Sequence, residues 1–264
     1  MNLIFSLLLK LSAIRSRILL NIKCNYFHEF GHSIPLGNGF WADLLEVDSY
    51  DSFSEIFIQR EYEEYLPSLP IFRILDIGAH YGYFSLWLQS MYPDNELSSI
   101  MIEPSPRCSR TLKKLIGNKR LCGRFYYLKR MIGNPQEDTG IFYDRPYMSG
   151  SSFSSSDDAE KIEVPILKEN DVQSKFPAPY DLIKCDIEGS EVELLTNYST
   201  LIKNSKYLLL EWHSWDNGGK RYSQIKDQLY KCNFEILKSS PPLPSVGRDG
   251  VVGLLLAKNI SLKS

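Results

Sequence analysis

Short apolar runs alternate with amphipathic segments along most of the chain after residue 70. The apolar runs have strand length, and the segments between them repeat apolar residues at helical spacing. We expect strands over 72–77, 97–102, 125–132, 180–185 and 207–212, with helices over 83–91, 109–116, 191–202 and 223–230. This alternation predicts a doubly wound α/β fold, in which helices cover both faces of a mostly parallel sheet.

The end of the chain departs from this alternation. Two further strands are expected over 234–237 and 251–256, and the loop between them carries glycine and proline but no helical pattern. We therefore expect these strands to pair as a hairpin, which makes one of them antiparallel to the sheet. The β-like stretches 139–143 and 162–167 flank a serine-rich segment, 149–156, which is expected to be a loop.

The N-terminal region lies outside the α/β pattern. Residues 2–22 repeat apolar positions at helical spacing, and Lys10, Arg15 and Arg17 interrupt the run, which favours an amphipathic helix over a membrane span. Such a helix either packs on the domain or on a second subunit, as in a homodimer, or it lies on a membrane surface.

The expected domain begins after a loop-rich stretch. Residues 24–50 are rich in loop-forming residues, and 52–66 reads as a helix with Ser54 as its N-cap and Pro67 after its end. We divide the chain into an N-terminal extension, 1–50, and one α/β domain, 51–264.

Composition and charge fit this picture and narrow the function. The chain has 264 residues, enough for one such domain, and its net charge is −2. A nucleic-acid-binding protein usually has a basic excess, so no nucleic acid partner is expected. The five cysteines are scattered with no C-x-x-C pair, which is typical of a reducing compartment and predicts a cytoplasmic protein, membrane-associated only if the N-terminal helix lies on a membrane.

The turn after the first strand carries the first chemical signal. It reads Asp76-Ile77-Gly78-Ala79-His80-Tyr81-Gly82. A nicotinamide-binding G-x-G-x-x-G turn would need glycines at positions 80 and 83, where the chain has His80 and Tyr83. S-adenosylmethionine (SAM) has no phosphate and tolerates fewer glycines. Asp76 suits contact with its ammonium group, directly or through water, and Glu103, which follows the second strand, suits its ribose hydroxyls.

Two further polar clusters follow neighbouring strands. Asp186 and Glu188 come directly after the strand 180–185, and His213 ends the segment Glu211-Trp212-His213 of the next strand. Because ligands bind at the carboxyl ends of parallel strands, we expect Asp186, Glu188 and His213 to face one crevice.

Together these motifs resemble the FkbM family of SAM-dependent methyltransferases. The resemblance rests on ILDIGAHYGYFS, IEPSP, DLIKCDIEGSE and LLLEWH, in that order, and covers about residues 53–237. It implies a class I methyltransferase fold with seven strands, one of them antiparallel, and O-methylation of a hydroxyl on a sugar, a glycan or another small molecule. The family usually has asparagine where this chain has His80. The expected cofactor-binding residues are Asp76, Gly78, Ala79, His80, Tyr81, Gly82, Glu103, Pro104 and Ile132.

The acceptor side leaves several roles open. Deprotonating a hydroxyl calls for a positioned base, and His213 is preferred because the pKa of histidine lies near neutrality. Asp186 is the second candidate, and His213 is then a histidine satisfied within the structure. Asp186 and Glu188 would also suit a divalent cation, but one D-x-E pair is weak support, so no metal is assigned. Glu188 would equally cap the following helix. The alternative to an enzyme is an inert binding or membrane-adaptor protein that kept the fold.

Overall fold

The computed structural model describes residues 33–68, 70–93, 96–145, 159–215, 220–245 and 249–262. The amphipathic helix expected over 2–22 and the serine-rich segment 149–156 lie outside these ranges. Among the helices that the structure describes, none combines the length and the apolar character that crossing a membrane requires.

One central sheet organises the molecule. Its strands are β3 (Arg73–Ile77), β4 (Ser98–Ile102), β5 (Phe125–Leu128), β8 (Tyr180–Cys185), β9 (Ser205–Ser214), β10 (Phe234–Ser239), β11 (Leu243–Pro244) and β12 (Val251–Asn259). The order along the main path is β10-β12-β9-β8-β3-β4-β5, with the short β11 paired to β12. Only β12 runs antiparallel to its neighbours on this path, as expected from the sequence. Seven strands on one path, one of them antiparallel, are what the resemblance to class I methyltransferases implies.

The strand order also shows where a ligand belongs. From β3 the chain moves outward to β4 and β5, and then returns to the other side of β3 as β8. Strand order therefore reverses between β3 and β8, and open sheets of this kind bind ligands beyond the carboxyl ends of such strands.

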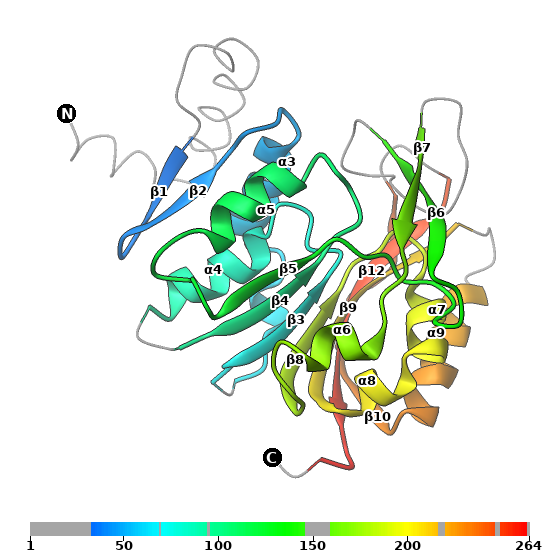
Figure 1. Cartoon of the computed structure of the whole chain (residues 1–264). Coiled ribbons are helices and arrows are strands. Elements are labelled where there is room, and N and C mark those ends of the chain that lie inside the picture. The colour runs from blue at the N-terminus through cyan, green and yellow to red at the C-terminus, as the bar shows by residue number, and fades with distance from the viewer. Residues whose placement is uncertain are drawn as a thin grey trace.

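Helices cover both faces of the sheet (Figure 1). They are α4 (Tyr83–Met91) and α5 (Ser109–Ile116) on one face, and α6 (Glu169–Gln173), α7 (Glu191–Asn197), α8 (Ser199–Lys203) and α9 (Lys220–Lys231) on the other. The single helix expected over 191–202 is interrupted at Tyr198, whose backbone leaves the helical region. The Tyr198 hydroxyl donates to the buried carbonyl of Leu167, so this side chain is fixed in the core where the two helices meet.

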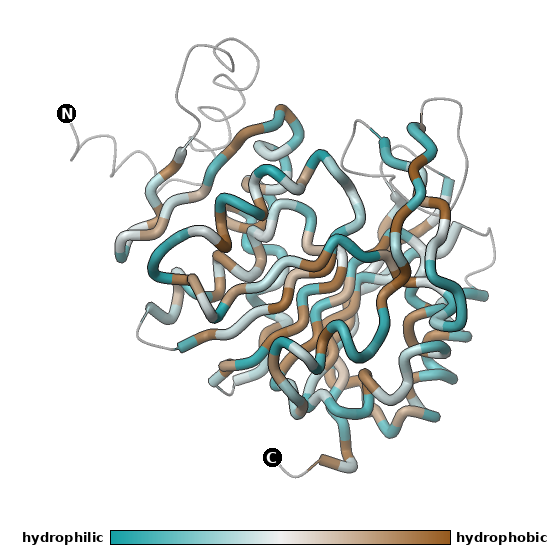
Figure 2. The backbone as a smooth tube through the Cα atoms, viewed as in Figure 1, coloured by the Kyte–Doolittle hydropathy of each residue, from teal (hydrophilic) through white to brown (hydrophobic). Residues whose placement is uncertain are grey.

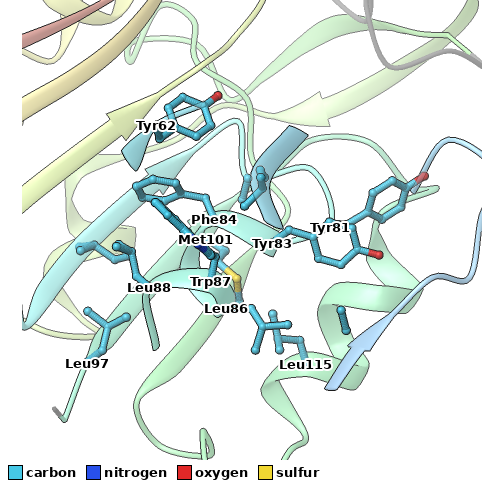
Figure 3. Packing of buried hydrophobic residues seen from close by; sticks show 14 of the residues in the cluster. Tyr62, Tyr81, Tyr83, Phe84, Leu86, Trp87, Leu88, Leu97, Met101 and Leu115 are labelled. Atoms are coloured by element: carbon cyan, nitrogen blue, oxygen red, sulfur yellow. The ribbon is translucent and has the colours of Figure 1, made fainter. Parts of the chain in front are cut away.

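The two faces of the sheet form two separate hydrophobic cores. Successive strand residues point to opposite faces, so Ile74 packs with α4 and α5, whereas Leu75 and Ile77 pack on the side of α6–α9. In Figure 2 the central strands are accordingly among the most hydrophobic parts of the tube. Figure 3 shows the first core, where Tyr62 lies beside Phe84 with ring centroids 5.3 Å apart.

Part of the stretch expected to be loop-rich is a β-hairpin. β1 (Ser33–Gly37) and β2 (Phe40–Asp43) pair antiparallel, and Asn38 and Gly39 both have positive φ in the turn between them. Asn-Gly is a strong hairpin signal because both residues tolerate this backbone region. The hairpin packs on the domain: Tyr83 of α4 donates to the carbonyl of Asp43. The boundary drawn at residue 50 thus falls within a stretch that packs against the domain.

The helix expected over 52–66 is three shorter elements. α3 (Ser49–Phe53) continues directly into the π-helix η1 (Ser54–Gln59), and the 3-10 turn η2 (Glu63–Tyr65) follows. Ser54 has helical backbone angles inside this run, so it is not the N-cap, which is Asp48. Arg60 then adopts a left-handed conformation and turns the chain back over the sheet. This turn brings residues 55–62 to the carboxyl ends of the strands.

A small second sheet borders the same end of the molecule. β6 (Thr139–Asp144) and β7 (Glu160–Pro165) pair antiparallel, separately from the central sheet. The strand expected over 125–132 ends at Leu128, and Met131 instead bridges Ile166, which follows β7.

Candidate active site

One cavity lies beyond the carboxyl ends of β3, β4, β8 and β9. Eight of the residues expected to bind cofactor or act in catalysis line it: Gly78, Ala79, His80, Glu103, Pro104, Ile132, Asp186 and Glu188. The structure thus brings together, in one space, residues from three separate motifs of the sequence and Ile132. The first six form what we call the cofactor half. Asp186 and Glu188, with Ser52, Glu55, Ile56, Glu61, Tyr62, Lys184 and Glu211, form the acceptor half.

The turn after β3 needs glycine at position 78 for a packing reason. Gly78 has φ of 72°, and a Cβ atom there would stand 1.7 Å from the backbone oxygen of Asp186. The N–H groups of Gly78 and Ala79 both donate to the carbonyl of Ile102, at 3.0 and 3.1 Å. The turn is therefore clamped between β8 and β4, with one face left open to the cavity.

His80 occupies a position that suits asparagine. Its φ is 49°, in the left-handed region where asparagine is favoured among residues with a side chain. Burial lowers the pKa of His80 to about 4, so the ring is neutral near pH 7. Its backbone N–H donates to Glu103 at 2.9 Å. The departure from the family pattern therefore keeps the backbone geometry of the turn.

Glu103 is the carboxylate of the cofactor half. It follows β4 and is 7% exposed; one oxygen accepts from the N–H of His80 and the other from the N–H of Ser105, at 2.8 Å. Burial raises its pKa to about 7, although both backbone hydrogen bonds act in the opposite direction. A carboxylate oriented by two backbone donors keeps lone pairs for two vicinal hydroxyls. Together with the apolar Pro104 and Ile132, this hydrogen-bond acceptor fits the ribose and adenine of SAM.

Three expected cofactor residues do not line the cavity. Asp76 lies on the α4 face of β3, fully buried, where it accepts a hydrogen bond from Ser85 and lies 3.8 Å from the Lys184 ammonium. Strand alternation directs Ile77 and Asp76 to opposite faces, and Asp76 does not line the cavity. Its contact with the ammonium of SAM, directly or through water, stays a prediction.

Tyr81 and Gly82 likewise contact the interior of the protein and do not line the cavity. The Tyr81 hydroxyl donates to the buried Asp48. Gly82 has φ of 76° at the N-cap of α4, and a Cβ there would meet Met101 and Leu115 at 2.8 Å. Tyr81 thus ties the turn to the start of α3, and Gly82 lets the start of α4 lie close to β4 and α5.

Carboxylates dominate the acceptor half. Glu188 follows β8, Glu211 is on β9, and Glu55 and Glu61 come from η1 and the turn after it. Burial, reinforced by the negative charge of neighbouring carboxylates, raises the pKa of all four to about 8. Glu188 also has φ of 53°, an unfavourable conformation for a residue other than glycine, asparagine or aspartate.

Tyr62 and Lys184 contact the carboxylates of the acceptor half from the interior of the protein. The Tyr62 hydroxyl donates to Glu211 at 3.0 Å and to Asp186 at 3.5 Å. Lys184 donates to the carbonyl of Gly78 at 2.9 Å and lies 3.5 Å from Asp186. Lys184 thus connects the turn of the cofactor half to the acceptor half.

His213 lies behind the carboxylates of the acceptor half, does not line the cavity and is protonated near pH 7. Its Nδ1 is 2.9 Å from Glu191, which is fully buried, and its Nε2 lies 3.8 Å from both Glu188 and Glu211. Burial alone would lower the pKa of His213, but the hydrogen bond to Glu191 and the surrounding carboxylates outweigh this effect and raise it to about 10. A histidine that already holds its proton near pH 7 cannot accept another one. This environment argues against the role of general base expected for His213.

Some residues of the site had little or no signal in the sequence. Glu55, Glu61 and Tyr62 belong to a segment with an ordinary amphipathic pattern, and only the turn at Arg60 brings them to the cavity. Lys184 had a usable signal, because a charged residue inside the apolar strand YDLIKC needs a buried partner.

Comparisons with known proteins show the family of the chain. The Methyltransferase FkbM domain matches residues 76–236, more than half of the chain. The methyltransferase sdnD of Sordaria araneosa is 27% identical over 243 residues, covering 74% of this chain and 90% of that protein.

Solved structures with a similar chain path are more distant. The methyltransferase FkbM of Methylobacillus flagellatus KT has a TM-score of 0.47 at 16% identity, covering 79% of this chain and 54% of that one. The fibrillarin pre-rRNA processing protein of Methanococcus jannaschii has a TM-score of 0.46 at 15% identity, covering 73% and 70%.

Proposed function

The chain belongs to the FkbM family of methyltransferases, whose methyl donor is SAM, and from this premise we propose that it methylates a hydroxyl group of a sugar, a glycan or another small molecule. The observation that carries the proposal is the single cavity, which is lined both by the Gly78 turn with Glu103 and by the carboxylates that follow β8 and β9. Donor and acceptor sites of a transferase must open into one space, because the reacting atoms have to meet.

The cofactor half would hold SAM through a small number of contacts. Glu103 would accept hydrogen bonds from the ribose hydroxyls, while the backbone N–H groups of His80 and Ser105 keep its two oxygens in position. When bound, SAM supplies the methyl group as an electrophile on its sulfonium. Pro104 and Ile132 line the same half and offer apolar surface to the adenine.

The acceptor half is suited to a hydroxyl. Carboxylates accept hydrogen bonds from hydroxyl groups, and a hydroxyl that is methylated must lose its proton to a nearby group. Asp186 and Glu188 line the cavity. We assign Asp186 to taking the proton, and Glu188, whose pKa of about 8 leaves it protonated near pH 7, to orienting the hydroxyl. His213, which is protonated, would help to hold Glu188 and Glu211 in place rather than act on the acceptor.

Transfer of labelled methyl tests this proposal. Purified protein is incubated with SAM carrying an isotopically labelled methyl group and with a cell extract, and the labelled products are identified by mass spectrometry. We expect label in a methyl ether of a small molecule or glycan, and its loss in Asp186→Asn. Label in nitrogen or carbon positions would contradict O-methylation. Failure to bind SAM at about 1 mM, measured by calorimetry, would contradict the proposal as a whole.

A further inference from the structure

A cluster of potential metal ligands lies in the acceptor half. Asp186 follows β8, whereas Glu211 and His213 are two residues apart on β9 and therefore on the same face of the sheet. One ligand atom from each of the three lies within 4.8 Å of the other two. Glu188 borders this cluster, with one oxygen 3.8 Å from His213 Nε2.

His213 is oriented as a ligand would be. Its side chain is 4% exposed, and Nδ1 is fixed by Glu191 at 2.9 Å. Nε2 is thereby directed at Glu188 and Glu211, each at 3.8 Å, which is too long for a hydrogen bond. A histidine whose other nitrogen is held by a buried carboxylate is the usual arrangement at metal centres, because it fixes both the tautomer and the ring orientation.

In each of the two carboxylates of the cluster, one oxygen is engaged by neighbouring side chains and the other is available. Tyr62 donates to Oε2 of Glu211 and to Oδ2 of Asp186, and Lys184 lies 3.5 Å from the same Asp186 oxygen. Among the described residues, no hydrogen bond reaches Glu211 Oε1 or Asp186 Oδ1. Each carboxylate is thus held by one oxygen and keeps the other for a ligand.

We propose that Asp186, Glu211 and His213 bind one divalent cation, with Mn²⁺ as the class that suits them best. Ligand atoms at about 2.1 Å from one ion lie about 3 to 4.2 Å apart, so small side-chain rotations close the cluster around it. In the free chain His213 holds a proton, and a cation bound at Nε2 would displace it, because metal binding to imidazole releases the proton. Carboxylates suit Mg²⁺ and Mn²⁺, and the imidazole shifts the preference toward a transition metal.

The role of this cation rests on the proposed function. Asp186, Glu188 and Glu211 line the same cavity as the Gly78 turn, so a cation there would have open coordination positions toward the acceptor. The cation would bind the acceptor hydroxyl and fix its orientation. It would also make the hydroxyl proton easier for a carboxylate of the acceptor half to remove.

Electron paramagnetic resonance of free Mn²⁺ tests the proposal without measuring activity. The full chain is stripped with chelator and titrated with Mn²⁺. We expect one site per chain, and a loss of affinity of about 30-fold or more in Glu211→Gln and in His213→Gln. Glu55→Gln is the matched control, since it makes the same substitution in the same cavity outside the cluster, and its Mn²⁺ affinity should stay within about threefold. Circular dichroism checks that each variant is folded, and Asp186→Asn replaces any variant that is not.

Two results would overturn the metal site. One is no Mn²⁺ binding by the wild-type chain up to about 1 mM. The other is an equal loss in Glu55→Gln and Glu211→Gln, which would mean diffuse attraction of a cation to an acidic cavity. S-adenosylhomocysteine binding is measured in parallel by calorimetry. If it binds while Mn²⁺ does not, the metal site is refuted and the proposed function stands; if Mn²⁺ binds alone, the proposed function fails and the metal site stands.

Discussion

Replacing Glu103 by glutamine should weaken cofactor binding and remove its pH dependence. Glu103→Gln keeps the size of the side chain and removes its charge. A hydrogen bond to a charged group contributes about 1.5–3 kcal/mol, so losing the charge on one or two ribose contacts should weaken binding by about 10- to 100-fold. The N–H groups of His80 and Ser105 donate to different oxygens of Glu103, at 2.9 and 2.8 Å, and an amide nitrogen cannot accept from either. One of these two hydrogen bonds is therefore lost as well, and a larger loss of affinity would include misplacement of the side chain.

The pH dependence follows from the pKa of about 7 that burial gives Glu103. The ribose hydroxyls donate to the ionised form, so affinity should rise with pH and become constant above the pKa. If only the ionised form binds, about one-tenth of the sites are competent at pH 6 and about nine-tenths at pH 8, which predicts about tenfold tighter binding at the higher pH. His80, whose pKa is lowered to about 4, does not titrate in this range.

Calorimetry with two ligands makes the assay specific. S-adenosylhomocysteine gives the full affinity, and adenosine carries the ribose without a titrating amino-acid tail, so its pH dependence reports the protein alone. The wild-type chain should show the tenfold change with both ligands, and Glu103→Gln should show none. Wild-type adenosine affinity that is constant between about pH 6 and 8, or unchanged affinity in Glu103→Gln, would refute the reasoning.

Two further substitutions test the contacts around the Gly78 turn. Lys184→Met leaves the fully buried Asp76 without its cation and should lower the free energy of unfolding by about 3–5 kcal/mol in urea titrations, whereas Lys114→Met, which breaks an exposed pair with Asp43, should cost less than about 1 kcal/mol. Equal costs would show that Lys184 is not a buried counter-ion. Gly78→Ala brings a Cβ to 1.7 Å from the Asp186 oxygen and should abolish S-adenosylhomocysteine binding or folding, whereas Gly123→Ala, with positive φ but no atom within 4 Å, should cost only about 1 kcal/mol and bind normally. A Gly78→Ala variant that binds like the wild type would contradict the clamped turn.

The sequence predicted the parts of the fold that follow from hydrophobic periodicity. Helices α4 and α5, strand β8 and the antiparallel β12 lie where the pattern places them, because burial on the sheet determines which positions must be apolar. The hairpin around Asn38-Gly39 was missed, although its turn signal is local and readable. The π-helical turns of η1 have no such signal, because a widened turn depends on tertiary packing.

The site was predictable in its location and less so in the role of each side chain. Motifs at the strand ends led to Gly78, Glu103 and Asp186, all of which line the cavity. Asp76 belongs to the same motif, but whether a residue at a strand end meets the ligand or the interior depends on strand parity, which shifts with a one-residue change in register. The charge of His213 could not be predicted from the sequence, because it depends on Glu191 and two other carboxylates that only the fold brings to the ring.

A crystal structure of the chain with S-adenosylhomocysteine tests the central claim most directly. The account predicts the ligand in the cavity beyond β3 and β4, with both ribose hydroxyls at hydrogen-bond distance, about 3 Å, from the Glu103 carboxylate and its sulfur facing Asp186. A ribose held by any other carboxylate, or a ligand bound outside this cavity, would contradict it.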